Sequence, residues 1–449
     1  MSINHLSRLP KSLRLRKSIM EEIMDSRTRL LTAIAGEEPD RVPLYCWVFG
    51  FKAPKELRWT EKCREVTHWY TMRLEHIHTL PQKWDIQQDF LRVDRWLSLG
   101  LDDVLDVSVP WSAHPDVTIR DWKQPPSAQE PYIPPLGGVG GGYTILCREY
   151  NTPAGALRHL VRQTEEYQGE GWVIQPDHPE LFEDFNIPRG IEHAVSSPSD
   201  LPKLRYLLCD ATSAQLASYR EQMAQVKKFA DERKVLVQGW SAFGMDGIVW
   251  LCGVEGAVMA AMENPSFFQE LVDTMYDFDK RRTEIMLDVG GVDMVVQRGW
   301  YSSTPFWSPA LFRRFVLPHL KDLVTIAHQA GALFAYVMTT GLMAMLDELK
   351  EANIDLLYFV DPVQDNIDLK VFKQRLECNF AVAGGINSGV TLGRGTPDEI
   401  REAVYSAVHD LAKGGGFILS PVDALFPDTP SDNVKILIEA WREVCNYPI

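Results

Sequence analysis

The sequence has few of the signatures of a metal or redox centre. It contains no CxxC spacing and no HExxH motif, and its seven cysteines are scattered. They are Cys46, Cys63, Cys147, Cys209, Cys252, Cys378 and Cys445. Scattered thiols are typical of proteins from a reducing compartment, so we expect free cysteines and a cytoplasmic location rather than a disulfide framework.

The sequence also lacks an excess of positive charge. Lysine and arginine total 46 against 61 aspartate and glutamate residues, which gives a net charge of −15. A nucleic-acid partner is disfavoured, because such proteins carry a basic surface. No apolar run reaches transmembrane length, so we expect no membrane partner. The composition, 45% hydrophobic and 24% charged, is that of a soluble globular protein.

Basic residues gather near the N-terminus, but Glu21, Glu22 and Asp25 follow them closely. Transit peptides are poor in acidic residues. We therefore interpret residues 1–25 as a solvated helical arm that would serve in homodimer formation. Residues 26–449 are expected to form a single domain.

The stretch from Val292 to Gly341 sets the pattern for that domain. Residues 292–296 read as a buried strand, and Ser308 with Pro309 gives a helix start signal. Apolar residues then recur at helical spacing until Gly331, and a second strand follows over residues 332–338. The stretch is therefore a strand–helix–strand unit with polar side chains at its strand ends, where parallel α/β proteins bind ligands.

Eight such strands are expected. They begin at Val42, Asp103, Val235, Val292, Ala332, Ile354, Asn379 and Phe417. Eight parallel strands with intervening helices close a (β/α)8 TIM barrel. An open doubly wound sheet is the alternative, but no GxGxxG motif opens a helix after the first strand.

Residues 112–210 depart from this pattern, and we predict that they form inserted loops, short helices and a hairpin. The hairpin is expected at residues 143–150 and around Gly155. The Pro- and Gly-rich residues 124–142 are read as an irregular loop. No Lys-Ser/Thr pair follows them, and no helix opens after them to hold phosphate.

Five segments resemble the uroporphyrinogen decarboxylase superfamily. They are residues 27–43, 308–312, 383–386, 395–400 and 414–421. The resemblance spans residues 26–448 and implies a TIM barrel of that type. It also implies one of two activities: decarboxylation of uroporphyrinogen without a cofactor, or transfer of methyl groups to or from the corrinoid of a small partner protein.

Decarboxylases of the superfamily resemble one another in a segment, Met-Arg-Gln-Ala-Gly-Arg, that follows the first strand. Residues 45–51 of this chain are Tyr-Cys-Trp-Val-Phe-Gly-Phe instead. A substrate with eight carboxylates needs several cations. The cofactor-free carboxy-lyase is therefore the alternative reading, and methyl transfer is favoured.

Thiol-directed methyltransferases of the superfamily carry a zinc His-x-Cys pair and a later Cys. The matching positions here are Tyr336, Met338 and Asp423. Zinc requires thiolate, imidazole or carboxylate ligands, usually at least three, so zinc activation of a thiol is not supported. A zinc ion at other residues stays open. The resemblance therefore favours the methyl-donor half, in which an aryl methyl ether is demethylated onto the cob(I)alamin of a partner corrinoid protein.

A phenolate is a poor leaving group, so this reaction needs a proton donor. We predict Asp423, Tyr336 and Asp361 as catalytic residues, since burial can keep a carboxyl protonated. For each acid, the competing interpretation is a helix cap or an ion pair with arginine.

A second set of residues at expected strand ends should bind a flat substrate by stacking or hydrogen bonds. The set comprises Trp47, Asp106, Trp111, Gln238, Trp240, Gln297, Trp300, Tyr358 and Asn387. Some of these tryptophans are expected to be core, and burial with backbone hydrogen bonds is an equal alternative for the glutamines. Arg298 is expected to form an internal ion pair.

Overall fold

A parallel β-barrel forms the centre of the molecule. The computed structural model describes residues 23–49, 51, 53–58, 86–125, 144–163, 179, 181–426 and 428–449. The barrel strands, in spatial order, are β1 (Val104–Ser108), β8 (Leu236–Ala242), β9 (Met294–Gln297), β10 (Leu333–Val337), β11 (Leu356–Val360), β12 (Ala381–Ile386) and β13 (Phe417–Pro421). All neighbouring pairs are parallel. The predicted fold class is confirmed.

The eighth position of the barrel is filled by the extended residues 42–49. Leu44 forms a parallel bridge to Leu419 of β13, and Tyr45 forms one to Asp102, just before β1. We predicted a regular strand here, but the structure has isolated bridges. Pro43 explains part of this difference, because its nitrogen cannot donate to a neighbouring strand. Its carbonyl oxygen still accepts from Leu419 N at 2.9 Å.

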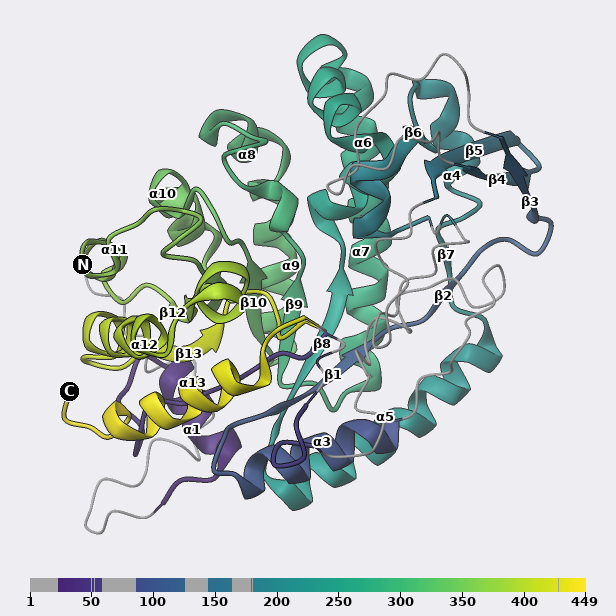
Figure 1. Cartoon of the computed structure of the whole chain (residues 1–449). Helices are drawn as coiled ribbons and strands as arrows, with labels where there is room; N and C mark the ends of the chain where they lie inside the picture. Colours follow the sequence, from purple (N-terminus) through teal and green to yellow (C-terminus); the bar gives the residue numbers. More distant parts are fainter. Residues whose placement is uncertain are drawn as a thin grey trace.

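Helices cover the outside of the barrel (Figure 1). They are α1 (Ser26–Ile34), α3 (Ile86–Ser98), α5 (Ser213–Arg233), α6 (Gly244–Glu263), α7 (Pro265–Val289), α8 (Pro309–Phe315), α9 (Leu317–Gln329), α10 (Leu342–Ala352), α11 (Leu369–Leu376), α12 (Pro397–Leu411) and α13 (Ser431–Val444). Short turns at strand ends are η5 (Trp300–Ser302) and the π-turn η6 (Ser388–Leu392). The capping box predicted at Thr396 and Glu399 is present at the start of α12.

The single helix predicted after Ser308 is in fact two helices. The break falls at Val316, between α8 and α9. Pro318 supplies the physical reason, since a proline has no N–H to donate to the carbonyl four residues earlier.

An insertion separates β1 from β8. Its main part is an antiparallel sheet of β3 (Thr118–Gln124), β4 (Ile145–Thr152), β5 (Gly155–Arg162) and β6 (Gly190–Glu192). It also contains β2 (Trp111–Ser112), η3 (Asp184–Arg189), η4 (Pro198–Asp200), α4 (Leu201–Leu204) and β7 (Cys209–Asp210). Figure 1 shows this sheet to one side of the barrel, near α6. The predicted hairpin is confirmed as β4–β5. Most of the glycine-rich loop and nearly all of the N-terminal arm lie outside the described residues.

Helix α6 has the length and composition of a membrane span, although no apolar run in the sequence was expected to reach that length. However, 61% of its most apolar window is buried inside the protein. It packs against α7, as the core helix of a globular protein does.

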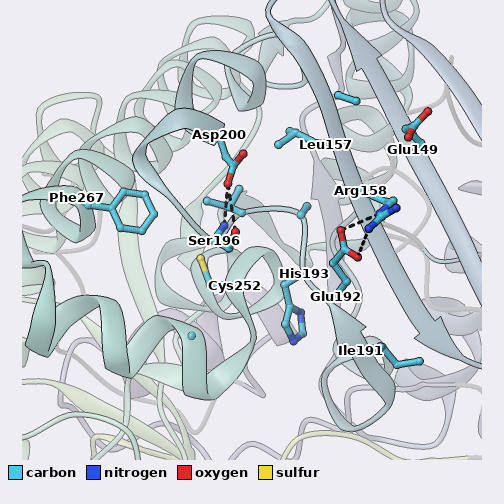
Figure 2. Close-up of a pocket in the computed structure, with 14 residues that line it drawn as sticks. Glu149, Leu157, Arg158, Ile191, Glu192, His193, Ser196, Asp200, Cys252 and Phe267 are labelled. Atoms are coloured by element: carbon cyan, nitrogen blue, oxygen red, sulfur yellow. Dashed lines mark hydrogen bonds and ion pairs between the residues drawn. The ribbon is translucent and has the colours of Figure 1, made fainter. Parts of the chain in front are cut away.

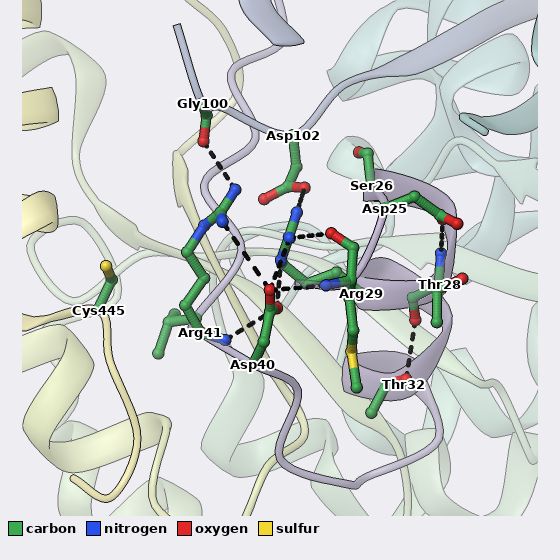
Figure 3. A network of polar contacts seen from close by, with 12 residues as sticks. Asp25, Ser26, Thr28, Arg29, Thr32, Asp40, Arg41, Gly100, Asp102 and Cys445 are labelled. Atoms are coloured by element: carbon green, nitrogen blue, oxygen red, sulfur yellow. Dashed lines mark hydrogen bonds and ion pairs between the residues drawn. The ribbon is translucent and has the colours of Figure 1, made fainter. Parts of the chain in front are cut away.

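A polar network lies where α1, the first barrel segment and the start of β1 meet (Figure 3). Arg29 of α1 donates to Asp40 and Asp102, at 2.6 Å in each case. Arg41 donates to the carbonyl oxygen of Gly100 at 2.9 Å. These contacts tie α1 to the first barrel segment and to the start of β1. The opening motif that carries the family resemblance therefore serves the fold.

Candidate active site

The interior of the barrel ends in a cluster of aromatic rings. Trp47, Trp240 and Trp300 stack, with ring centroids 5.5 to 6.3 Å apart and interplanar angles of 10 to 27°. Trp47 comes from the first barrel segment, Trp240 from β8, and Trp300 from the turn after β9. Stacked aromatic rings stabilise a fold by more than the apolar area that they bury. The three tryptophans therefore form one apolar wall, as their strand-end positions predicted.

A buried carboxylate holds this wall in place. Asp106 of β1 accepts hydrogen bonds from Trp240 Nε1 at 2.7 Å and from Gln238 Nε2 at 2.6 Å. The Tyr358 hydroxyl donates to Gln238 Oε1 at 3.0 Å. Burial, followed by the charge of Asp106, raises the pKa of Tyr358, so this phenol stays protonated. These predicted residues form one network with the tryptophans.

Asp361 and Asn387 form a second polar pair at the ends of β11 and β12. Asn387 Nδ2 donates to Asp361 Oδ2 at 2.7 Å. The other carboxylate oxygen of Asp361 accepts from the backbone N–H groups of Val363 and Gln364. The Asp361 carboxylate therefore organises its own loop, as the capping interpretation of this residue expected.

Asp423 follows β13 and lies in the left-handed region, with φ at 70°. Such strain in a non-glycine residue is concentrated at functional sites. Burial raises the pKa of the Asp423 carboxyl to about 7, and the nearby charge of Asp184 adds to the rise. Arg298 and the Trp300 side chain oppose it. A carboxyl of this kind is half protonated near neutral pH, which suits a general acid.

Arg298 is the cation that joins these groups. It lies 4.4 Å from the ring centroid of Trp300 and donates to Asp246 at 3.1 Å and to Asp184 at 2.9 Å. The expected internal ion pair is therefore present. Burial raises the pKa of Asp246 to about 7 against the opposing charge of Arg298.

Sequence reasoning missed Asp184 and Asp246. Asp246 follows the end of β8 within four residues, the same strand-end signal that singled out Asp361. Asp184 belongs to the insertion, where no periodic pattern marks it.

Three predicted residues lie elsewhere, which corrects their expected placement. Tyr336 and Gln297 are register partners on β10 and β9. Their side chains point outward, toward the helices. The Tyr336 hydroxyl donates to Ser302 at 2.6 Å, and Gln297 packs against Gly244. Trp111 packs with Phe243 and other rings of the helix-facing core. None of the three joins the tryptophan wall.

The described residues contain no group of three or more His, Cys, Asp or Glu side chains that could hold a metal ion. The positions that match the zinc ligands of thiol-directed relatives do not fit the ion either. Tyr336 and Met338 are fully buried in the helix-facing core.

The comparisons with known proteins agree with the fold. The family model "Uroporphyrinogen decarboxylase (URO-D)" matches residues 186–444, more than half of the chain. The chain belongs to the URO-D family. Relatives include the uroporphyrinogen decarboxylase of Prochlorococcus marinus strain MIT 9303, 24% identical over 304 residues, which cover 63% of this chain and 80% of that protein. The uroporphyrinogen decarboxylase of Thermus thermophilus is 28% identical over 137 residues, covering 30% and 38% of the two chains.

A solved methyltransferase from Methanosarcina mazei shares the architecture of this URO-D family member. Its TM-score is 0.51 at 15% identity, and the match covers 94% of this chain and 99% of that one. At this identity the likeness concerns the fold. The chemistry of this chain must be argued from its own residues.

Proposed function

We propose that this protein is a methyltransferase that demethylates a small aryl methyl ether. The cob(I)alamin of a small corrinoid-binding partner would supply the methyl acceptor. The observation that carries the proposal is the Asp423 carboxyl, whose pKa of about 7 lets it hold a proton beside the tryptophan wall.

The residues of this chain would have separate roles in binding and in proton transfer. The ring of the substrate would lie against Trp300, the partly exposed indole of the wall, and the buried rings of Trp47 and Trp240 support Trp300 from behind. Asp106 keeps Trp240 in its orientation. As the ether C–O bond breaks, Asp423 gives its proton to the oxygen, the methyl group passes to the acceptor, and a phenol leaves.

The alternative is a cofactor-free carboxy-lyase, which the names of the curated relatives favour. The charges argue against uroporphyrinogen as the substrate. Arg298, the cation that contacts the tryptophan wall, already bonds two carboxylates. Among the described residues, a ligand with eight carboxylates would find an aromatic and acidic surface there rather than arginine forks.

We place the enzyme in the cytoplasm, because the cysteines that the structure describes are free thiols. A zinc ion at residues other than Tyr336, Met338 and Asp423 is not part of the proposed mechanism. A homodimer formed through the N-terminal arm remains a prediction.

The test uses guaiacol and other methoxyarenes as substrates and chemically reduced cobalamin as acceptor. We expect catechol from guaiacol, measured by chromatography, together with loss of the cob(I)alamin absorbance. Asp423→Asn should lower the rate at least about a hundredfold, the usual contribution of a general acid. Asp347→Asn, on the exposed face of α10, should leave it unchanged. Carbon dioxide released from uroporphyrinogen without cobalamin, and no phenol from any methoxyarene, would favour the lyase.

A further inference from the structure

The insertion is fastened to α6 along its length. Helix α6 is kinked at Gly253, where φ is 71°, and the kink frees the carbonyl of Leu251 to accept from Val195 N at 2.9 Å. The His193 ring lies against the same glycine, since a Cβ there would stand 2.3 Å from His193 Nε2. The insertion therefore has a fixed position on this helix.

Figure 2 shows the seam between the two, a cavity of about 560 Å³. Two of its charged side chains pair with each other, and a third is held by a backbone group. Arg158 bonds Glu192 at 2.7 and 2.8 Å, and Asp200 accepts from the backbone N–H of Ser196 at 3.1 Å. The first contact joins β5 to β6, and the second fixes the loop that precedes α4.

Asp184 reaches from this insertion to the end of the barrel. It stands at the start of η3, and its two carboxylate oxygens contact different elements. Oδ1 accepts from Trp250 Nε1 of α6 at 2.8 Å, and Oδ2 accepts from Arg298 Nη2 at 2.9 Å. Asp184 thus links the insertion, α6 and the turn after β9 through one side chain.

The guanidinium that Asp184 bonds is held on all sides. It lies between the rings of Trp250 and Trp300, at 4.7 and 4.4 Å from their centroids. Asp246 accepts from its Nε at 3.1 Å. Cation–π contacts of this kind fix a guanidinium flat against an indole. Of these groups around the guanidinium, Asp184 is the one that comes from the insertion.

We propose that Asp184 is a positioning residue. It holds Arg298 against Trp300 and thereby sets the electrostatic environment of the Asp423 carboxyl. The inserted segment is then part of the catalytic machinery. This inference rests on the proposed role of Asp423 as the proton donor. It adds that an element outside the barrel controls when that donor is protonated.

The direction of the effect follows from the charges around Asp423. Asp184 and Asp361 raise the pKa of its carboxyl, and Arg298 lowers it. Asp246 acts on it through Arg298. Removing the negative charge of Asp184 leaves Arg298 less neutralised, so the pKa of Asp423 falls. The general acid then loses its proton at a lower pH. We expect a shift of about one pH unit, typical of one nearby charge.

The experiment compares Asp184→Asn and Asp184→Glu with Arg158→Gln. Arg158 forms an exposed ion pair on the same insertion and serves as the control. The rate of guaiacol demethylation with reduced cobalamin is measured from pH 5 to pH 9. The alkaline limb of the pH–rate profile should move down by about one pH unit in Asp184→Asn. It should return to the wild-type position in Asp184→Glu. It should not move in Arg158→Gln.

A second readout needs no substrate. Because Trp300 adjoins Asp423, tryptophan fluorescence should titrate with this carboxyl, and the wild-type signal minus that of Asp423→Asn isolates the transition. The same downward shift is expected in Asp184→Asn. A transition that stays in place in a folded Asp184→Asn variant would overturn the role of Asp184, whether or not methoxyarenes are substrates. Full activity in Asp423→Asn would instead overturn the proposed function.

Discussion

Replacing Asp423 with asparagine should make the protein relatively more stable at alkaline pH. The carboxyl has a pKa of about 7 in the folded protein and about 3.9 in an unfolded chain. A folded-state pKa above the unfolded value means that folding favours the protonated form. The stabilisation from this group is complete below pH 3.9 and is lost as the pH rises through 7.

The size of the effect follows from the same shift. Between pH 5 and pH 8 the folded protein loses the stabilisation that corresponds to about two pKa units. Each unit is worth about 1.4 kcal/mol of folding free energy. Partial exposure of Asp423 reduces the total from nearly 3 to about 2 kcal/mol. Asparagine is neutral throughout, so the variant should not lose this energy. For a chain of 449 residues, the difference corresponds to about 2 °C in thermal midpoint.

Circular dichroism melting at pH 5 and pH 8 measures this quantity. The midpoint of Asp423→Asn minus that of wild type should be about 2 °C more positive at pH 8 than at pH 5. Asp347→Asn, at an exposed position of α10, controls for a general effect of removing one negative charge. An equal midpoint difference at both pH values would show that Asp423 is ionised in the folded protein throughout this range, and the argument for a proton donor would fail.

Two further predictions concern the supports of the site. Gly253→Ala should lower the thermal midpoint by several degrees, because its Cβ would stand 2.3 Å from His193 Nε2 and φ is 71°. Gly256→Ala in the same helix meets no atom closer than 3.7 Å and should leave the midpoint unchanged or raise it. Asp106→Ala should cost about 2 to 3 kcal/mol, since the buried N–H groups of Gln238 and Trp240, which both donate to Asp106 Oδ1, would lose their acceptor. Near-ultraviolet circular dichroism should change with it, as Trp240 loses its acceptor.

Much of the barrel follows from the sequence because its strands are short apolar runs bounded by turn signals. That same uniformity explains the misplaced side chains. β9 and β10 are buried on both faces, so no alternation of polar and apolar residues tells which face a residue occupies. Gln297 and Tyr336 were assigned to the interior, whereas their strand neighbours Val296 and Val337 occupy it. An error of one residue in parity moves a side chain across the sheet.

Strand ends nevertheless identified most of the aromatic wall. Trp47, Trp240 and Trp300 stand at the carboxyl ends of the first barrel segment, β8 and β9, where parallel topology brings them together at one end of the barrel. The contribution of Asp184 was not accessible in this way. Its place depends on how the insertion docks on α6, which is a tertiary contact between residues distant in sequence.

The charges and hydrogen bonds around Arg298 also bear on the proton assignment. Asp184 and Asp246 bond its guanidinium, and Asp423 feels its charge, so the three carboxylates fully ionised would carry two uncompensated negative charges in a largely buried space. Such clusters keep a proton. Asp184 accepts from Trp250 and Arg298, and Asp246 accepts from Arg298 and from the Tyr301 N–H. A proton on Asp246 would remove one of the two bonds that its carboxylate accepts. Burial raises the pKa of both Asp246 and Asp423 to about 7, and the bonds accepted by Asp246 make the carboxyl of Asp423, beside Trp300, the better place for the proton.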